Sequence, residues 1–357
     1  MVALVGVIFL FLPLKVISIL SLQGGFSRLL TIFFVAAGVI ISALTDLFAI
    51  PLYLMKMTQL YYSYQQEEPF VIPERTKEQQ HGFKRQLAVV LIIVIVGVIA
   101  VDVYFDRVFP TESKVKIIAH RGGGNEGNEN TLSGLETAWN AGAYGSEIDI
   151  QRTKDGYYIV NHDGTFKRVA GIDKKPEEMT LREVKKLSVN GDPVPTYDEM
   201  LVASRGRIVL FTELKGKTAD KKMADDAIRL IKSYSMEDEV VLVSLKYDLI
   251  DYIETNYPEM QTGFLTFASF GKTSNLNCDY IGLEEESATS DAISSIHDEG
   301  KKVLVWTANE EESQRHFLCT LADGLITDNV TQAIELSGEL GDRSDLDRMV
   351  DRIKTIM

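Results

Sequence analysis

The chain has 357 residues, of which 45% are hydrophobic and 25% are charged, so it is too long for one small domain and too apolar for a disordered chain. Residues 1–110 contain 8 basic and 7 acidic side chains, and the other 247 residues contain 29 basic and 44 acidic ones. Nucleic acids are bound mainly through Lys and Arg, so this acidic balance excludes a nucleic-acid-binding protein. Two cysteines exclude a disulfide-rich scaffold.

Three apolar runs lie near the amino terminus, at residues 2–22, 29–54 and 87–101. Each is long enough to cross a bilayer as a helix, the third when its flanking residues are included. A run without a polar face does not suit a helix in water. The sequence therefore predicts an α-helical membrane region over residues 1–110, with about three transmembrane helices, and the bilayer is an expected partner.

Basic side chains predict the orientation of this region. The loop between the second and third runs contains five Lys and Arg residues, whereas the link between the first two runs contains Arg28. Cytoplasmic loops carry an excess of Lys and Arg, so we expect the loop at 56–86 in the cytoplasm. The domain after the third run is then expected on the extracellular face of a multi-pass protein of the cell membrane.

Residues 113–337 have the pattern of a separate α/β domain, in which short β-branched runs alternate with amphipathic stretches. Eight runs predict buried strands: 115–119, 145–152, 207–213, 240–245, 262–267, 280–283, 302–307 and 324–327. Such an alternation indicates a parallel sheet covered by helices. Eight units fit a (β/α)8 barrel, the TIM barrel, and an open doubly wound sheet is the alternative.

Two further segments do not follow the alternation. Residues 157–162 predict a hairpin return after the second strand, and residues 164–197 then form a long insertion at the same end. Long loops at one end of a sheet usually belong to function. Residues 338–357 predict a charged, helical carboxy-terminal tail.

Polar side chains stand where the first strands and the hairpin return end. They are His120, Arg121, Glu147, Asp149, His162, Glu213 and Lys215. Glu147 and Asp149 are two positions apart and therefore share one face of their strand. In a barrel of this kind the active site collects at the carboxyl ends of the strands. We therefore expect Glu213 of the next strand to join the two carboxylates in the barrel mouth.

The carboxylates of Glu147, Asp149 and Glu213 imply a cation, because like charges do not share a pocket of low dielectric constant without one. An all-oxygen ligand set favours Mg²⁺ or Ca²⁺ over zinc. His120 and His162 are then left for proton transfer. The arginine and lysine of the same set offer positive charge to an anionic substrate. Together these groups predict the hydrolysis of a phosphodiester.

These residues lie in three of six short blocks that follow one another along the chain. The blocks are IIAHRG at 117–122, ENT at 129–131, GAYGSEIDIQRTKDGYYIVNHD at 142–163, TELK at 212–215, VWTAN at 305–309 and GLITDN at 324–329. In this order the sequence resembles the glycerophosphodiester phosphodiesterase family over about residues 113–337. Asn128 is a departure, because the family commonly has Pro before its Glu-Asn-Thr.

The resemblance implies a (β/α)8 barrel in which the three carboxylates bind one divalent cation, Mg²⁺ or Ca²⁺, and the two histidines are general acid and base. It implies that Arg121 and Lys215 bind the substrate phosphate, and Trp306 lies where the family packs its substrate. The expected reaction is metal-dependent hydrolysis of glycerophosphodiesters to sn-glycerol 3-phosphate and an alcohol.

Two alternatives to this reaction are open. A barrel tethered to a membrane could act on lysophospholipids or on teichoic-type polymers of the envelope with the same chemistry. The barrel could also be an inert binding or scaffold module. That reading predicts a missing ligand or histidine, and none is missing from the sequence.

Overall fold

The computed structural model describes residues 53–65, 92, 96, 115–267 and 276–341. The chain divides into two compact units, and the larger contains the described residues from 115 onward. In the smaller unit residues 53–64 form a helix. Within the described ranges, no helix has both the length and the apolar composition that a membrane crossing requires. The predicted spans at 2–22, 29–54 and 87–101 lie almost entirely outside those ranges.

Eight parallel strands form a closed barrel in the larger unit. The first strand, β1 (Lys116–Ala119), pairs with both β2 (Gly145–Arg152) and β11 (Gly324–Thr327). Between β2 and β11 the barrel contains β6 (Val209–Leu214), β7 (Val240–Ser244), β8 (Gln261–Thr266), β9 (Tyr280–Glu284) and β10 (Lys302–Trp306). Because β1 pairs with β2 the sheet has closed, which confirms the predicted (β/α)8 barrel and excludes the open doubly wound sheet.

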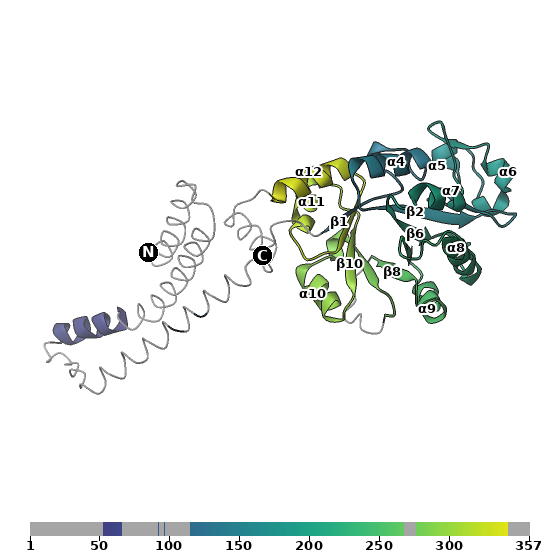
Figure 1. Cartoon of the computed structure of the whole chain (residues 1–357). Coiled ribbons are helices and arrows are strands. Elements are labelled where there is room, and N and C mark those ends of the chain that lie inside the picture. Colours follow the sequence, from purple (N-terminus) through teal and green to yellow (C-terminus); the bar gives the residue numbers. More distant parts are fainter. Residues whose placement is uncertain (1–52, 66–91, 93–95, 97–114, 268–275, 342–357) are drawn as a thin grey trace. The chain divides into compact units, whose positions relative to one another are not determined.

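Helices cover the outside of the barrel (Figure 1). They are α4 (Leu132–Ala141), α7 (Tyr197–Ser204), α8 (Lys221–Ser233), α9 (Tyr247–Asn256), α10 (Ser290–Asp298), α11 (Glu311–Leu318) and α12 (Val330–Gly341). Side chains cap several of them. The Thr131 hydroxyl accepts the N–H of Gly134 at the start of α4, at 3.1 Å. Residues 338–341 of the predicted tail belong to α12, and residues 342–357 lie outside the described ranges.

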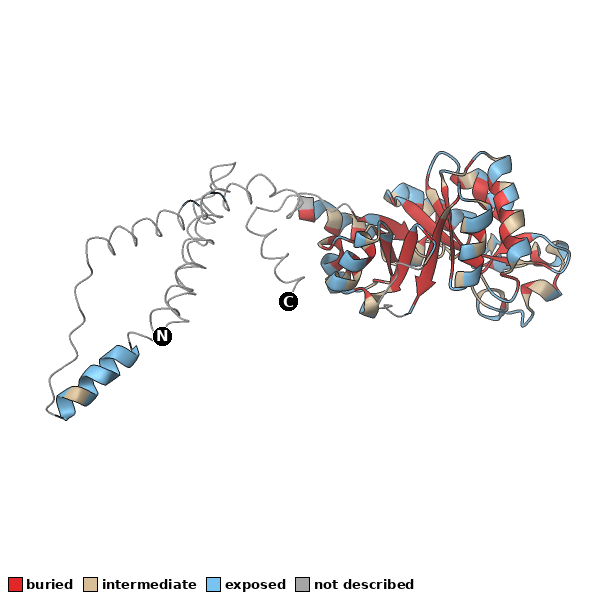
Figure 2. Ribbon diagram, turned by 90° about the horizontal axis from the view of Figure 1, so that it is seen from below, coloured by how far each residue is buried: buried red, intermediate tan, exposed pale blue. Residues whose placement is uncertain are grey.

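Alternate strand residues belong to two apolar layers. The side chains inside the barrel are Ile118, Phe211, Val241, Val243, Leu265, Tyr280, Leu304 and Ile326. Outward-facing residues such as Ile148 and Leu210 pack with the helices in a second, larger cluster. Figure 2 shows the strands buried, whereas the covering helices expose one side. Gly145 leaves room inside the barrel, because a Cβ there would lie 2.7 Å from the ring of Phe211.

The chain departs from the alternation after β2, as predicted. The strand β3 (Tyr158–Val160) returns antiparallel to β2. The insertion contains α5 (Lys167–Ala170), the 3₁₀ turn η2 (Pro176–Glu178), α6 (Leu181–Val184) and the strand pair β4 (Ser188–Val189) and β5 (Asp192–Pro193). Its residues Phe166 and Val184 are buried in a small apolar cluster that includes Ile159 of β3. The insertion is therefore fixed to the hairpin by packing.

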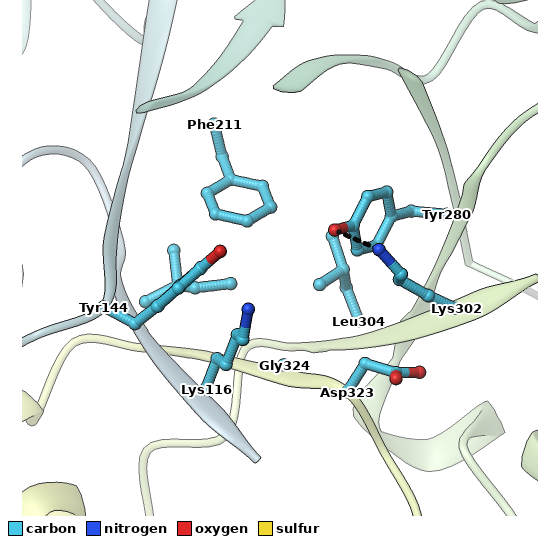
Figure 3. A pocket seen from close by; sticks show the side chains of 9 residues that line it. Lys116, Tyr144, Phe211, Tyr280, Lys302, Leu304, Asp323 and Gly324 are labelled. Carbon is cyan, nitrogen blue, oxygen red and sulfur yellow. Dashed lines mark hydrogen bonds between the residues drawn. The ribbon is translucent and has the colours of Figure 1, made fainter. Parts of the chain in front are cut away.

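A cavity of about 90 Å³ lies at the amino-terminal end of the barrel. The first residues of several strands line it, among them Lys116, Tyr280 and Lys302 (Figure 3). Lys302 donates a hydrogen bond of 3.2 Å to the Tyr280 hydroxyl, and the Lys116 ammonium lies 3.7 Å from the centroid of the Tyr144 ring. The predicted catalytic side chains stand at the other ends of the strands, so this cavity is separate from them.

Candidate active site

The alternation of the barrel strands carries polar side chains into the mouth above the apolar interior. His120 follows Ile118 by two positions, and Glu213 follows Phe211 in the same way, so each continues the inward-facing row of its strand. In β2 the inward-facing row contains Gly145 and is followed by Glu147 and Asp149. The same period that buries the apolar residues therefore aims the acidic and imidazole groups at one point.

Three carboxylates meet at this point. Asp149 of β2 lies in register with Glu213 of the neighbouring β6. One carboxylate oxygen from each of Glu147, Asp149 and Glu213 lies within 4.8 Å of the other two. The three residues are only 3%, 1% and 6% exposed. The structure thus brings together the three predicted metal ligands in a buried cluster.

Lys215 is the cation in contact with this cluster. Its ammonium donates hydrogen bonds of 2.9 Å to Asp149 and 2.8 Å to Glu213. Burial and the repulsion of the other two carboxylates raise the pKa of Glu147 well above its usual value. Burial and the repulsion of Asp149 raise the pKa of Glu213 to about 7. For Asp149 the opposite holds, because Lys215, His162 and the Asn130 amide outweigh burial and lower its pKa. One ammonium does not balance three carboxylates.

The loop after β1 supplies two further contacts to the cluster. The backbone N–H of Arg121 donates to Glu147 at 2.9 Å. Asn130 donates its amide to Asp149 at 2.9 Å and accepts the Asp149 N–H at 3.2 Å. Arg121 and Asn130 both have left-handed backbone conformations, with φ of 49° and 55°. Such conformations are uncommon for residues with a Cβ and concentrate at functional sites, where surrounding contacts maintain them.

Each of the two predicted catalytic histidines has an aspartate partner at Nδ1. His120 Nδ1 lies 2.8 Å from Asp328, which follows β11. Asn309 holds that aspartate through two hydrogen bonds of 2.7 and 2.8 Å. His162 Nδ1 lies 2.9 Å from Asp163. In both pairs the carboxylate orients the ring.

His162 also contacts Arg121, whose Nη2 lies 3.0 Å from Nε2 of the ring. A guanidinium only donates, so Nε2 must accept and carry no proton. The proton of the neutral ring is then on Nδ1, facing Asp163. Burial lowers the pKa of His162, against the opposing influence of Asp149 and Asp163. The geometry and the pKa both favour a neutral ring with its lone pair on Nε2.

Trp306 is the predicted site residue for which the described part of the chain shows no hydrogen bond or ion pair to the other predicted site residues. Its described ring contact is with Phe267. Trp306 ends β10, and its ring packs edge-on against Phe267 with centroids 5.0 Å apart. Its indole Nε1 is buried without a hydrogen-bond partner in the described part of the chain. Trp306 and Phe267 are thus an apolar side of the mouth.

Sequence reasoning assigned no role to Asp163, Asp328, Asn309 and Asn130, although all four lie in the recognised blocks. Asp328 could have been found by the period of β11, because it follows the inward-facing Ile326 by two positions. Arg168 of the insertion was also missed, because the sequence does not show where an irregular segment folds back.

Gly124→Ala is expected to destabilise the fold more than Gly206→Ala. Both glycines have left-handed backbones, with φ of 62° and 67°, so each substitution costs about 1–2 kcal/mol of strain. A Cβ at Gly124 would also lie 2.3 Å from the backbone oxygen of Asp328, whereas nothing lies within 4 Å at Gly206. Urea unfolding of both variants measures the difference. Equal losses would show that the loops of β1 and β11 do not pack this closely.

The sequence matches a known family. Residues 120–332, more than half of the chain, match the Glycerophosphoryl diester phosphodiesterase family. A glycerophosphodiester phosphodiesterase of Caldanaerobacter subterraneus is 26% identical over 242 residues, which cover 62% of this chain and 98% of that protein. Glycerophosphodiester phosphodiesterase 1 of Rattus norvegicus is 37% identical over 142 residues, which cover 37% of this chain and 41% of that protein.

Solved structures are similar as well. The glycerophosphodiester phosphodiesterase of Thermotoga maritima has a TM-score of 0.54 at 25% identity, covering 62% of this chain and 98% of that one. A phosphodiesterase of Oleispira antarctica, solved in complex with the product sn-glycerol-3-phosphate, has a TM-score of 0.59 at 22% identity, covering 62% and 96%. The match over the barrel shows that the chain belongs to the glycerophosphoryl diester phosphodiesterase family and is a phosphoric diester hydrolase.

Proposed function

We propose that the chain hydrolyses glycerophosphodiesters to sn-glycerol 3-phosphate and an alcohol, using one divalent cation. The observation that carries this proposal is the buried cluster of Glu147, Asp149 and Glu213, whose oxygens lie within 4.8 Å of one another, beside two imidazoles with aspartate partners. The sn-glycerol-3-phosphate bound to the Oleispira antarctica phosphodiesterase is the product that this reaction would give.

The donor set fits a hard divalent cation. Its three donors are carboxylate oxygens, which suit Mg²⁺ or Ca²⁺ better than zinc. Burial and then repulsion by the other two carboxylates raise the pKa of Glu147, and a cation held by Glu147, Asp149 and Glu213 would offset both effects. When bound, such an ion supplies positive charge that stabilises the negative charge on the phosphoryl oxygens.

The two histidines are proposed to move the protons. Nε2 of His162 accepts from Arg121 in this structure. When Arg121 binds the phosphate instead, the Nε2 lone pair can accept the proton of the nucleophile, which is water or the 2-hydroxyl of the glycerol group. The lowered pKa of His162 keeps this base neutral near pH 7. His120, oriented by Asp328, is then the acid that protonates the oxygen of the departing alcohol. A cyclic phosphate appearing early in the reaction would identify the glycerol hydroxyl as the nucleophile.

Arg121 and Lys215 are proposed to bind the phosphate. The Arg121 Nε–H is buried, and no acceptor for it is found in the described part of the chain. A buried donor of this kind normally has a partner, and a phosphate oxygen is a suitable one. Trp306 and Phe267 would pack against the carbon atoms of the substrate.

The purified full-length chain is expected to release sn-glycerol 3-phosphate from glycerophosphocholine when Mg²⁺ or Ca²⁺ is present. EDTA is expected to abolish the release, because the anionic substrate then meets uncompensated carboxylates, and one of the two ions is expected to restore it. An enzyme-coupled assay for sn-glycerol 3-phosphate measures both steps. Full activity in protein shown by elemental analysis to be free of divalent metal would contradict the cation.

Lysophosphatidylcholine and a polyglycerol-phosphate polymer distinguish the alternative substrates, when the release of choline is followed for the first and the release of sn-glycerol 3-phosphate for the second. Both keep the phosphodiester and change the group attached to it. Faster turnover of either one than of glycerophosphocholine would assign the enzyme to membrane or envelope substrates.

We also propose that the apolar runs at 2–22, 29–54 and 87–101 anchor the barrel on the extracellular face of the cell membrane. Their length and the five basic residues of the loop at 56–86 support this orientation. Protease added to intact cells should remove the barrel. A barrel that is cut only after the membrane has been opened would refute the orientation.

A further inference from the structure

Arg168 of α5 connects the insertion to two loops of the candidate active site. Its guanidinium donates four hydrogen bonds, all to carboxylates. Two of 2.8 and 2.7 Å go to Glu129, and two of 2.7 and 3.1 Å go to Asp163. The planar fork of arginine holds carboxylates in fixed directions, which a lysine does not do.

The two carboxylates held by Arg168 each face a group that the proposed reaction uses. Asp163 is the partner of His162 Nδ1, at 2.9 Å. Glu129 lies 3.5 Å from Nη1 of Arg121, and its side chain is 20% exposed. Arg168 therefore contacts neither group directly. Asp163 connects it to His162, the proposed base, and Glu129 connects it to Arg121, the proposed phosphate ligand.

Removal of Arg168 would leave two carboxylates, Glu129 and Asp163, without the cation that they share. With Arg168 present, Glu129 and Asp163 share its guanidinium, which lowers the pKa of Asp163 to about 2 although burial opposes the shift. Without it, Glu129 has Arg121 as its nearest cation. A tight pair between Glu129 and Arg121 would withdraw positive charge from the substrate phosphate. Asp163 would at the same time lose the groups that fix its orientation.

We propose that Arg168 is a positioning residue, which fixes the Asp163–His162 pair and balances Glu129 so that Arg121 stays available to phosphate. The proposal rests on the proposed function, because it acts through His162 and Arg121. It predicts two separate effects of losing Arg168, one on kcat through His162 and one on KM through Arg121.

The first test compares Arg168→Met with Arg182→Met in the full chain. Arg182 is an exposed arginine of α6 in the same insertion, so it is a matched control. Loss of a residue that orients a reacting group typically costs about 10–100-fold in activity. We expect Arg168→Met to lower kcat by about this factor and to raise KM, and Arg182→Met to change neither. The proposal is overturned if Arg168→Met stays within about twofold of the wild type in both parameters.

A second substitution separates positioning from general loss of structure. Adding Glu129→Gln to Arg168→Met removes the carboxylate that would capture Arg121, so KM should return toward the wild-type value. kcat should stay low, because Asp163 still lacks the guanidinium of Arg168. Damage to the fold would lower kcat and the melting temperature together, and Glu129→Gln would not return the raised KM toward the wild-type value. That outcome also overturns the proposal.

Arg168→Lys covers the case in which Arg168→Met does not fold. Lysine keeps the charge that balances Glu129 and loses the fork that orients Asp163. KM near the wild-type value with lowered kcat is expected, and unchanged kcat would contradict the positioning of His162.

A readout without turnover distinguishes this inference from the proposed function. In ¹⁵N-histidine NMR spectra at fixed pH, the His162 signals are identified by their loss in His162→Gln. The wild type should show the proton on Nδ1, and Arg168→Lys should show a mixture of the two ring forms. An inactive wild type with this difference refutes the function and keeps the positioning role. An active wild type without the difference refutes the positioning role alone.

Discussion

His120→Gln and His162→Gln are each expected to lower kcat for glycerophosphocholine by about 10²–10⁴-fold, because a positioned acid or base contributes that much to a proton-transfer step. KM is expected to change little, since the phosphate is assigned to Arg121 and Lys215. His316→Gln, on the outer face of α11, is the matched control and should keep full activity. Melting temperatures close to the wild type would show that the losses arise in the chemistry.

The two histidine variants should differ in their dependence on pH. Burial lowers the pKa of His162 from its usual 6.5, so the neutral base is present above that lowered pKa and is lost as the pH falls through it. The acidic limb of kcat/KM should therefore lie below pH 6.5 in the wild type. It should disappear in His162→Gln and persist in His120→Gln. An acidic limb that survives in His162→Gln would assign the base to another residue.

The convergence of the carboxylates could be predicted because it depends on two local rules. Glu147 and Asp149 are two positions apart in one strand, and this period places them on the same face in any register. Glu213 follows in the next parallel strand, and consecutive strands of a (β/α)8 barrel are neighbours. Only the register that sets Asp149 beside Glu213 had to come from the structure.

The partners of the two histidines were harder to predict, for different reasons. The contact of His120 with Asp328 joins residues 208 positions apart, and it exists only because β1 and β11 pair when the barrel closes. Arg168 lies in an insertion whose path is set by packing around Phe166, without a repeating pattern. Periodicity identifies the residues that reach the mouth, whereas closure and irregular packing decide which groups hold them.

Glu147→Gln is expected to abolish activity, by at least about 10²-fold, because it removes one ligand of the proposed cation. Its effect on stability should reverse with the ion. Burial, then repulsion by Asp149 and Glu213, raise the pKa of Glu147 in the folded chain above its usual 4.5. For a carboxyl with a raised folded pKa, stability is fully present below the unfolded pKa and is lost as the pH rises through the folded pKa. At pH 7 without metal, the carboxyl group of Glu147 therefore lowers the free energy of unfolding.

Glutamine keeps the shape of the side chain and an oxygen that can accept the Arg121 N–H, but it has no charge. In EDTA the variant should therefore unfold at a higher urea concentration than the wild type, and its stability should change less between pH 5 and pH 8. Addition of Mg²⁺ or Ca²⁺ at about 100 times its Kd should stabilise the wild type by about 2.7 kcal/mol. The variant should gain much less, because two carboxylates remain of three.

The wild type should thus be less stable than Glu147→Gln in EDTA and more stable than Glu147→Gln with the cation. This reversal separates a metal site from a structural ion pair. If Lys215 alone compensated the carboxylates, neutralising Glu147 would stabilise the chain equally with and without the ion, and the wild type would show no metal-dependent gain. Urea unfolding of both proteins in the two buffers measures all four values. A variant less stable than the wild type in EDTA would show that Glu147 is not repelled in the metal-free fold, and the argument for a cation from buried like charges would fail.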